Sequence, residues 1–328
     1  RRRIGQAEHD FGDLIQDIPA IAGAATNPSV NNGGGDGAST VSLRGLGEDR
    51  TLLLLNGRRI ADYPLPFGGE QNGVDIGAIP MSALARVELL SSGASAIYGS
   101  DAIGGVLNFI TKRDMDQTEA SVTVGSFEDG VGKTLIGSVI TGNSFERGSF
   151  TFGLDGFIND QILASDVDYL KRNAPYNAGM VSIQQNAPPA PVQSVLPQSA
   201  CAPLGFEYVG EVCEREVSNT ISLQPGIRQL SGYFDGRYDL ADNVELFATA
   251  IATDNVYETR SNVLFWNGVV GREDFSSAVF LTRGFSSRET GSADVESDQR
   301  AWTVTTGVKG GFDLGAERWH WDVSYSYA

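Results

Sequence analysis

Two linked segments near the start of the chain decide its fold: VSLRGLGEDRTLLLLNGRRI at residues 41–60 and IPMSALARVELLSSGASAIYGSDAIGGVLNFITK at residues 79–112. Both combine short apolar runs with glycines, which favour turns and close backbone contacts. From residue 119 onward the pattern changes to alternating apolar and polar residues, which is typical of β-strands. We therefore expect a mainly β protein, with a small α+β domain at residues 1–113 and antiparallel strands at residues 114–328.

The composition favours a folded β protein and argues against a nucleic-acid partner. Of the 328 residues, 41% are hydrophobic, which is enough to bury a core, and 40 are glycine, which weakens helices. The formal net charge is −17, whereas a nucleic-acid binder needs a clustered basic face. The acidic excess lies almost wholly in the strand-rich part. An acidic exterior suits a cell surface or simple solubility, and we favour solubility as the explanation.

Residues 1–113 read as one compact domain. Apolar residues at helical spacing in FGDLIQDIP predict a short helix over residues 11–18 that stops at Pro19. NNGGGDGAS at residues 31–39 then forms a flexible connection. Short strands separated by Gly-rich turns, such as Asn56-Gly57, are expected at residues 40–44, 51–55, 86–90 and 106–111.

WHWDVSYSY at residues 319–327 shows the alternating pattern most clearly. Its odd-numbered positions are aromatic or apolar, and its even-numbered positions are polar. The apolar face is too aromatic to face water, so we expect lipid outside and a polar lumen inside. Residues 302–313 and 150–156 follow the same rule, whereas residues 132–142 and 244–254 carry apolar residues on both faces.

About seven strands of roughly ten residues are expected, which is the length that a membrane-spanning barrel strand needs. Short turns alternate with long connections at residues 159–229 and 257–298, which we expect to be outer loops. Alternating strands also build soluble sandwiches and propellers, and the preceding Gly-rich domain shifts the odds toward the membrane. The expected strands are 119–127, 132–142, 148–158, 230–240, 244–256, 299–313 and 317–328.

Residues 11–112 resemble the plug domain of TonB-dependent outer-membrane receptors, and the strands that follow resemble the start of their barrel. The resemblance is carried by the Arg-Gly turn at residues 44–45, the LLLLNGRR segment, the RVELL strand and above all ASAIYGSDAIGGVLNFITK at residues 94–112. It implies a barrel of 22 strands around the plug, so seven strands predict an incomplete barrel. The resemblance also implies an upstream segment that recruits TonB, which we do not find in this sequence.

Some residue types in these motifs have physical roles of their own. Arg44 could present its guanidinium bidentately to a barrel carboxylate and latch the plug, and the alternative is an ordinary solvated arginine. Many family members have Arg-Gly-Pro where this chain has Ser-Gly-Ala at residues 92–94, so a second latch arginine is absent there. Glycines allow tight turns within a narrow lumen, and plain packing explains Glu88 and Tyr98 equally well. The plug signature and latch candidates are Arg44, Gly45, Asn56, Gly57, Arg58, Glu88, Tyr98, Gly99, Gly104 and Gly105.

Cys201 and Cys213 are the only two cysteines, and they bracket a short segment within a Pro-rich stretch. A disulfide that closes a surface loop is the preferred reading over free thiols, and it implies an oxidising compartment. His9 and His320 are the only histidines, so the sequence predicts no zinc site, and it also predicts no cofactor and no catalytic residue. The Gly45-Leu46-Gly47 sequence lacks the third glycine of a dinucleotide fingerprint.

The resemblance predicts a Gram-negative outer-membrane receptor, with its plug toward the periplasm and its barrel in outer-membrane lipid. It would import a scarce solute of the siderophore, cobalamin, saccharide or peptide class, and TonB of the inner membrane would displace the plug. The alternatives are a surface-binding or signalling β-protein that captures a ligand without transport, and a soluble β-rich enzyme acting on glycans. Substrate specificity depends on loops whose binding residues the sequence does not identify, so the substrate stays unassigned.

Overall fold

The computed structural model describes residues 21, 37–64, 73–91, 93–127, 130–167, 182–184, 198–204, 206–209, 212–214, 222–260, 265–271, 278–284, 294–315 and 317–328. The chain divides into two compact units. The first comprises Arg1–Asn159, Ile227–Tyr257 and Ser297–Ala328, and the second comprises Asp160–Gly226 and Glu258–Glu296. In the described ranges, no helix has both the length and the apolar character needed to cross a bilayer.

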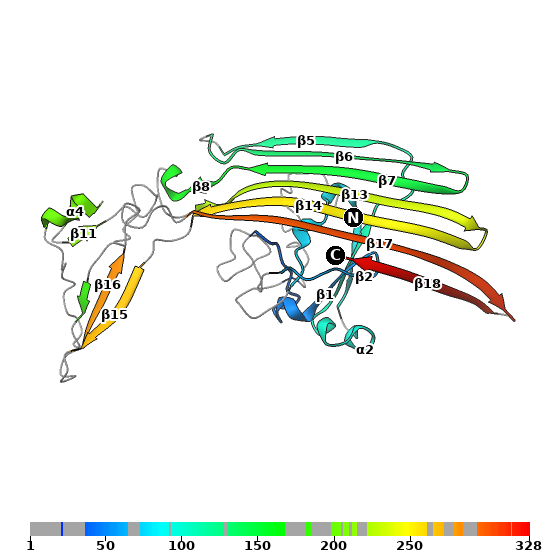
Figure 1. The fold of residues 1–328 in the computed structure, drawn as a ribbon, viewed down its shortest axis with the longest axis horizontal. Helices are drawn as coiled ribbons and strands as arrows, with labels where there is room; N and C mark the ends of the chain where they lie inside the picture. Colours follow the sequence, from blue (N-terminus) through cyan, green and yellow to red (C-terminus); the bar gives the residue numbers. More distant parts are fainter. Residues whose placement is uncertain are drawn as a thin grey trace. The chain divides into compact units, whose positions relative to one another are not determined.

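The first unit contains a small domain, which we call the plug, built on a four-stranded sheet (Figure 1). Strand β1 pairs in parallel with β4, while β2 and β3 are antiparallel to their neighbours, in the order β2-β1-β4-β3. Short helical turns connect the strands. The elements are η2 (Glu48–Arg50), β1 (Thr51–Leu55), β2 (Arg58–Arg59), η3 (Ile76–Ala78), η4 (Met81–Ala83), β3 (Leu84–Leu90), α2 (Ser95–Tyr98), η5 (Ser100–Ala102) and β4 (Gly105–Thr111).

The apolar run TLLLL forms β1 because both faces of this strand are covered. Leu53 packs with Leu107 and Phe109 in one cluster, while Leu52 and Leu54 join a second cluster on the other face. A nearly continuous apolar run is typical of a strand buried on both sides. The strands predicted at residues 51–55, 86–90 and 106–111 are confirmed, and β3 begins two residues earlier than expected, at Leu84.

The strand predicted at residues 40–44 is wrong. These residues are buried up to Leu43, but only an isolated bridge between Leu43 and Ile21 links them to another segment. Side chains take the place of a strand ladder, because the amide of Leu43 donates to Thr51 Oγ1 at 2.9 Å and the amide of Ser39 donates to Asp75 Oδ1 at 2.9 Å. The predicted helix at residues 11–18 and the first part of the connection at residues 31–39 lie outside the described residues.

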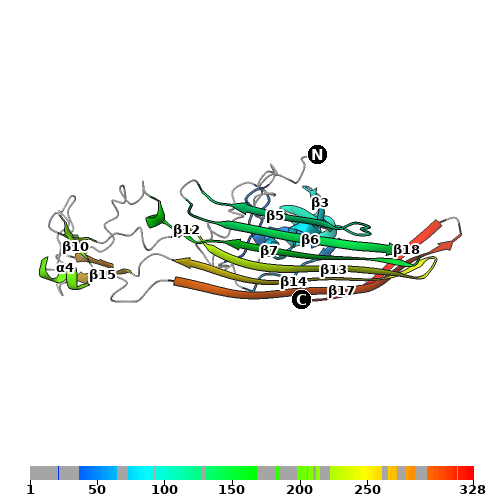
Figure 2. The same cartoon turned by 90° about the horizontal axis from the view of Figure 1, so that it is seen from above.

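Seven antiparallel strands form a sheet, which we call the wall, and the plug lies on one of its faces (Figures 1 and 2). All seven predicted strands are present. Neighbouring strands follow the order β18-β17-β14-β13-β7-β6-β5. They are β5 (Glu119–Gly125), β6 (Thr134–Phe145), β7 (Gly148–Asn159), β13 (Gly226–Ala241), β14 (Val244–Arg260), β17 (Asp294–Leu314) and β18 (Glu317–Tyr327).

Three wall strands are longer than the sequence pattern indicates. Strands β13, β14 and β17 contain 16, 17 and 21 residues, whereas about 9–11 residues span a bilayer. They extend into the ranges predicted as long loops. Backbone hydrogen bonds to neighbouring strands hold these extensions. Such bonds form whether or not the side chains alternate between apolar and polar.

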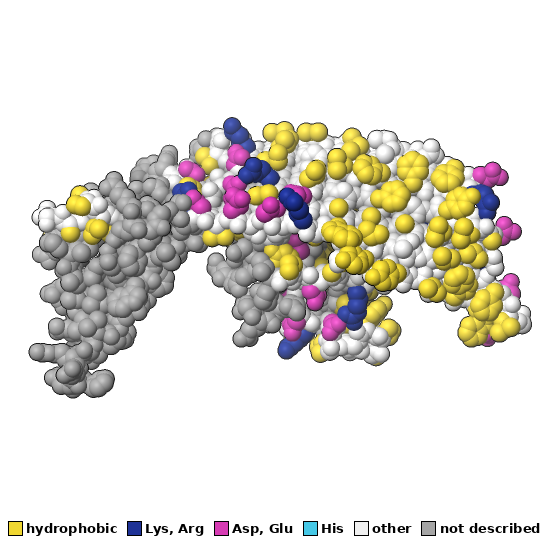
Figure 3. Space-filling view, viewed as in Figure 1, with side chains coloured by type: hydrophobic (Ala, Val, Ile, Leu, Met, Phe, Trp, Pro, Cys, Tyr) yellow, Lys and Arg dark blue, Asp and Glu magenta, His cyan; other side chains and the backbone are white. Residues whose placement is uncertain are grey.

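The two faces of the wall carry the expected side chains. Trp319 and Tyr325 are 51% and 67% exposed on the outer face, and hydrophobic groups gather over the wall strands between charged groups near the two ends (Figure 3). Contact with the plug explains why β14 carries apolar residues on both faces. Leu246 points outward, whereas its neighbour Phe247 is 5% exposed and faces the plug.

The second unit holds short elements within the two long connections. Strands β15 (Phe265–Gly271), β16 (Ala278–Gly284) and β9 (Ser182–Gln184) form a three-stranded sheet. The others are β8 (Ile162–Leu163), η6 (Ala164–Asp166), α4 (Gln198–Leu204), β10 (Glu207–Val209), β11 (Val212–Glu214) and β12 (Ser222–Gln224).

Cys201 lies in α4, is 1% exposed, packs against Phe206 and is disulfide-bonded. Cys213 belongs to β11, and its side chain lies outside the described residues. Pairing between these two cysteines therefore stays a prediction.

Candidate functional site

Arg58 makes a bidentate contact between the plug and the wall. Its Nη2 donates to both carboxylate oxygens of Asp322 at 3.0 and 2.8 Å, and its Nε donates to Ser324 Oγ at 3.1 Å. The guanidinium also lies 4.6 Å from the centre of the Phe247 ring. Because the pair is partly exposed to solvent, we expect these contacts together to be worth on the order of 1–3 kcal/mol.

The turn before Arg58 places it there. Asn56 and Gly57 have φ values of 52° and 82°, the left-handed conformation that a two-residue hairpin turn requires. The Asn56 side chain bonds to Thr111 of β4, and the amide of Gly57 donates to Asn108 Oδ1 at 2.8 Å. The turn is thus tied to the plug sheet, and the strand that leaves it presents Arg58 to the wall.

A second set of contacts joins wall side chains to the plug backbone. Gln229 Nε2 donates to the carbonyl of Gly77 at 2.7 Å, and Thr253 Oγ1 donates to that of Ala78 at 2.9 Å. The amide of Ser82 donates to Asp155 Oδ2 at 2.8 Å. Because these bonds end on backbone atoms, they hold the η3 and η4 turns whatever side chains the turns carry.

Tyr233 is the largest fully buried side chain of this interface. Its hydroxyl lies within hydrogen-bond distance of Thr111 Oγ1, at 2.8 Å, and of the carbonyl oxygen of Lys112, at 3.0 Å, and the side chain is 1% exposed. Its ring belongs to a small apolar cluster that joins plug and wall. The other buried members of this cluster are Ala83, Met115, Ile140 and Ile251.

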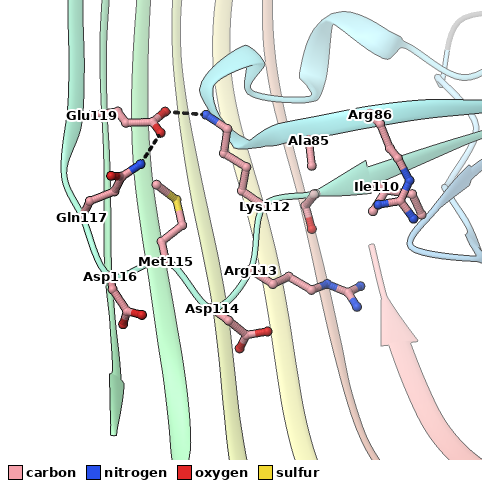
Figure 4. Close-up of a pocket in the computed structure, with 11 residues that line it drawn as sticks. Ala85, Arg86, Ile110, Lys112, Arg113, Asp114, Met115, Asp116, Gln117 and Glu119 are labelled. Carbon is pink, nitrogen blue, oxygen red and sulfur yellow. Dashed lines mark hydrogen bonds and ion pairs between the residues drawn. The ribbon is translucent and has the colours of Figure 1, made fainter. Parts of the chain in front are cut away.

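The segment that links the plug to β5 lines an open hollow of about 630 Å³ (Figure 4). Lys112 Nζ bonds to Glu119 Oε2 at 2.7 Å, and Gln117 donates to the other oxygen of Glu119 at 3.1 Å. These bonds tie the two ends of the link together. Arg113 lies on the same link, and its burial, together with the nearby Arg237 guanidinium, lowers its pKa.

Arg44 and Glu88 bond within the plug among the described residues. Arg44 Nη2 donates to the carbonyl of Ser91. Glu88 accepts from Arg86 Nε at 2.8 Å and from Asn108 Nδ2 at 3.2 Å. The bidentate contact to a wall carboxylate that the sequence suggested for Arg44 is made instead by Arg58, and a latch role for Arg44 stays a prediction.

The glycine positions fit tight turns and close packing. A Cβ on Gly104 would lie 2.9 Å from the carbonyl oxygen of Arg50. A Cβ on Gly105 would lie 2.8 Å from that of Leu90, and its φ of 135° disfavours any side chain. Gly45 and Gly99 have φ values of 66° and 87°.

Tyr98 packs against the second apolar cluster of the plug. Its carbonyl accepts from Arg59 Nη2 at 2.8 Å. These contacts are those of a packing residue.

Sequence reasoning did not assign the wall partners of Arg58. The alternation placed Asp322 and Ser324 on the polar face of the last strand, but it does not say which plug residue meets them. Phe247 had a weak signal, since an apolar residue on the inner face of a wall strand marks a contact with the plug. In the described ranges, no group of three or more His, Cys, Asp or Glu residues is arranged to hold a metal ion.

Sequence comparison identifies the plug. The family model described as the TonB-dependent receptor plug domain matches residues 3–106. The iron-regulated outer membrane virulence protein of Vibrio cholerae is 35% identical over 118 residues, which cover 36% of this chain and 17% of that protein. The vitamin B12 transporter BtuB of Photobacterium profundum is 36% identical over 152 residues, which cover 45% of this chain and 23% of the transporter. The matches thus span about a fifth of the length of these curated relatives.

Structural comparison extends the similarity to the wall. The crystal structure of a variant of the ferric enterobactin receptor of Pseudomonas aeruginosa matches with a TM-score of 0.51 and 14% identity, over 97% of this chain and 46% of that receptor. This similarity shows the fold alone, and it confirms the predicted plug followed by antiparallel barrel strands. The predicted outer-membrane location is confirmed by the plug match and by the relatives. Residues 3–106 therefore belong to the plug-domain family of TonB-dependent receptors, and the chain as a whole has the fold of such a plug followed by strands of a receptor barrel.

Proposed function

We propose that this chain forms the plug and wall strands of an importer for a scarce solute. Binding at the outer side would be followed by displacement of the plug, driven by TonB. Binding energy alone does not move a solute uphill, and the outer membrane holds no nucleotide. The energy would therefore come from the inner membrane through TonB.

One observation carries the proposal: among the described residues, the plug is held to the wall largely by separate polar contacts. Arg58 and Asp322 form a partly exposed charge pair, and the plug base is held mainly by single hydrogen bonds. The apolar cluster between plug and wall has only five buried members among the described residues.

The solute belongs to the siderophore, cobalamin, saccharide or peptide class. The names of the matched proteins concern iron and vitamin B12, which favours the first two classes. Binding and passage need no bond to be made or broken in the solute, so we propose a transporter and not an enzyme.

Uptake assays in a receptor-deletion strain test this function. The strain is complemented with the full-length receptor and supplied with a panel of labelled ferric siderophores, cobalamin, saccharides and peptides. Deleting the TonB-recruiting segment upstream of the plug should abolish uptake of the active solute and leave its binding to whole cells unchanged. Persistent uptake would contradict the proposal, and binding without uptake by the intact receptor would favour capture or signalling.

A further inference from the structure

Lys309 of β17 lies directly opposite Asp322 in the ladder with β18. Directly opposed residues of antiparallel strands share one face and have Cβ atoms about 4.5–5.5 Å apart, so a lysine there reaches an opposed aspartate. In this structure, however, Lys309 Nζ bonds to Glu245 Oε1 at 2.9 Å, and Asp322 is occupied by Arg58 of the plug. The wall aspartate therefore has a second cation within reach.

Lys309 and Arg58 also compete for the same aromatic ring. The Arg58 guanidinium lies 4.6 Å from the centre of Phe247, and Lys309 Nζ lies 5.9 Å from it. Two like charges on one ring repel each other. With the plug docked, Lys309 thus weakens the hold of the wall on Arg58.

Glu245 does not depend on Lys309 alone. Arg237 Nη1 lies 3.4 Å from the same oxygen of Glu245, and Arg237 also bonds to Asp235 at 3.0 Å. If the lysine turned away, Glu245 would still have a cationic neighbour. The wall therefore supplies one cation that is free to change partner.

We propose that Lys309 is the exchange partner of Asp322. When the plug withdraws Arg58, the ammonium of Lys309 turns from Glu245 to Asp322, so the wall carboxylate stays paired. The inference rests on the plug displacement proposed above and adds the residue that makes it reversible. Lys309 is a positioning residue, since it acts through Asp322.

This arrangement predicts that removing a positive charge tightens the plug. In Lys309→Met, withdrawal of Arg58 leaves Asp322 without a cation, and the repulsion between Lys309 and Arg58 in the docked state is gone. Both changes favour the docked state. A lysine that merely stabilised the interface would have the opposite effect when removed.

Constant-force pulling on the N-terminal side of the plug tests the proposal, with the full-length receptor folded in a lipid bilayer. The lifetime of the docked plug should rise roughly two- to fivefold in Lys309→Met, as expected for the loss of one partly exposed charge pair from the released state. Asp322→Asn should shorten the lifetime. Adding Lys309→Met to Asp322→Asn should then lengthen it clearly less than Lys309→Met lengthens it in the wild-type background, because only the repulsion from Arg58 is left to lose. Lys133→Met, which removes an exposed lysine outside the plug interface, is the matched control and should leave the lifetime unchanged.

Two outcomes would overturn the exchange. The first is a lifetime of the docked plug in Lys309→Met that is unchanged or shorter. The second is that Lys309→Met lengthens this lifetime by the same factor in the Asp322→Asn background as in the wild-type background. If Lys309→Met does not show the heat-modifiable gel migration of a folded barrel, Lys309→Gln gives the same test with a polar side chain. The pulling assay uses neither TonB nor solute. A failure here is therefore distinct from a failure of the proposed import function, which uptake measurements decide.

Discussion

The β2 edge of the plug and its base are held to the same wall by different kinds of contact. At the edge, Arg58 reaches Asp322 and Ser324 side chain to side chain, in a partly exposed setting. At the base, wall side chains bond to plug backbone around Gly77, Ala78 and Lys112, next to a buried apolar cluster. We therefore expect the contacts at the base to be little affected by surface substitutions or salt, whereas both should change the stability of the contact at the edge.

The largest expected effect comes from Tyr233 at the base. Tyr233→Ala removes a fully buried ring and its two hydrogen bonds, so the free energy of unfolding should fall by about 3–5 kcal/mol. Tyr233→Phe keeps the ring and should cost about 1 kcal/mol. Urea unfolding of the full-length protein in detergent, followed by proteolysis of the plug, measures both. Tyr238→Ala on the same strand, 41% exposed, is the control. An equal loss of stability there would show that the buried base contributes no more than an exposed position of the same strand.

A smaller effect is expected at the edge. Arg58→Gln and Asp322→Asn should each lower the stability of plug docking by about 1–2 kcal/mol, since each breaks one partly exposed charge pair. The double variant should lose little more than either single variant. A double-mutant cycle on plug protease protection measures the coupling. Additive losses would show that the two residues act separately, and the edge would then be no latch.

The smallest effect concerns the interior of the plug and its response to acid. The hydrogen bond from Arg59 holds the pKa of the Asp101 carboxyl below its usual value of 3.8. The stabilisation is therefore fully present above the usual pKa, which applies to the unfolded chain, and it is lost as pH falls through the lowered pKa of the folded protein. Wild-type protein should lose more stability between pH 5 and pH 3 than Asp101→Asn. Parallel acid slopes in urea titrations of the two proteins would contradict this.

Much of the wall could be predicted from the chain, because alternation of side chains is a local property. The seven strands and their outer aromatic face appear in the structure. The prediction of a strand at residues 40–44 is wrong because side chains replace the ladder there: the amide of Leu43 bonds to Thr51, and that of the preceding Ser39 bonds to Asp75. A short alternating pattern alone does not distinguish a strand from a buried extended segment.

The sequence by itself determined the change from a Gly-rich domain to alternating strands, the resemblance of the first part to a receptor plug, and, in the clearly alternating strands, which side chains face inward. Only the tertiary structure decided that, among the described residues, Arg58 meets a wall carboxylate while Arg44 bonds within the plug, and that Lys309 lies opposite that carboxylate. The physical reason is distance along the chain. Strand period and turn chemistry act over a few residues, whereas Arg58 and Asp322 are 264 positions apart and meet only because the plug docks on the completed sheet.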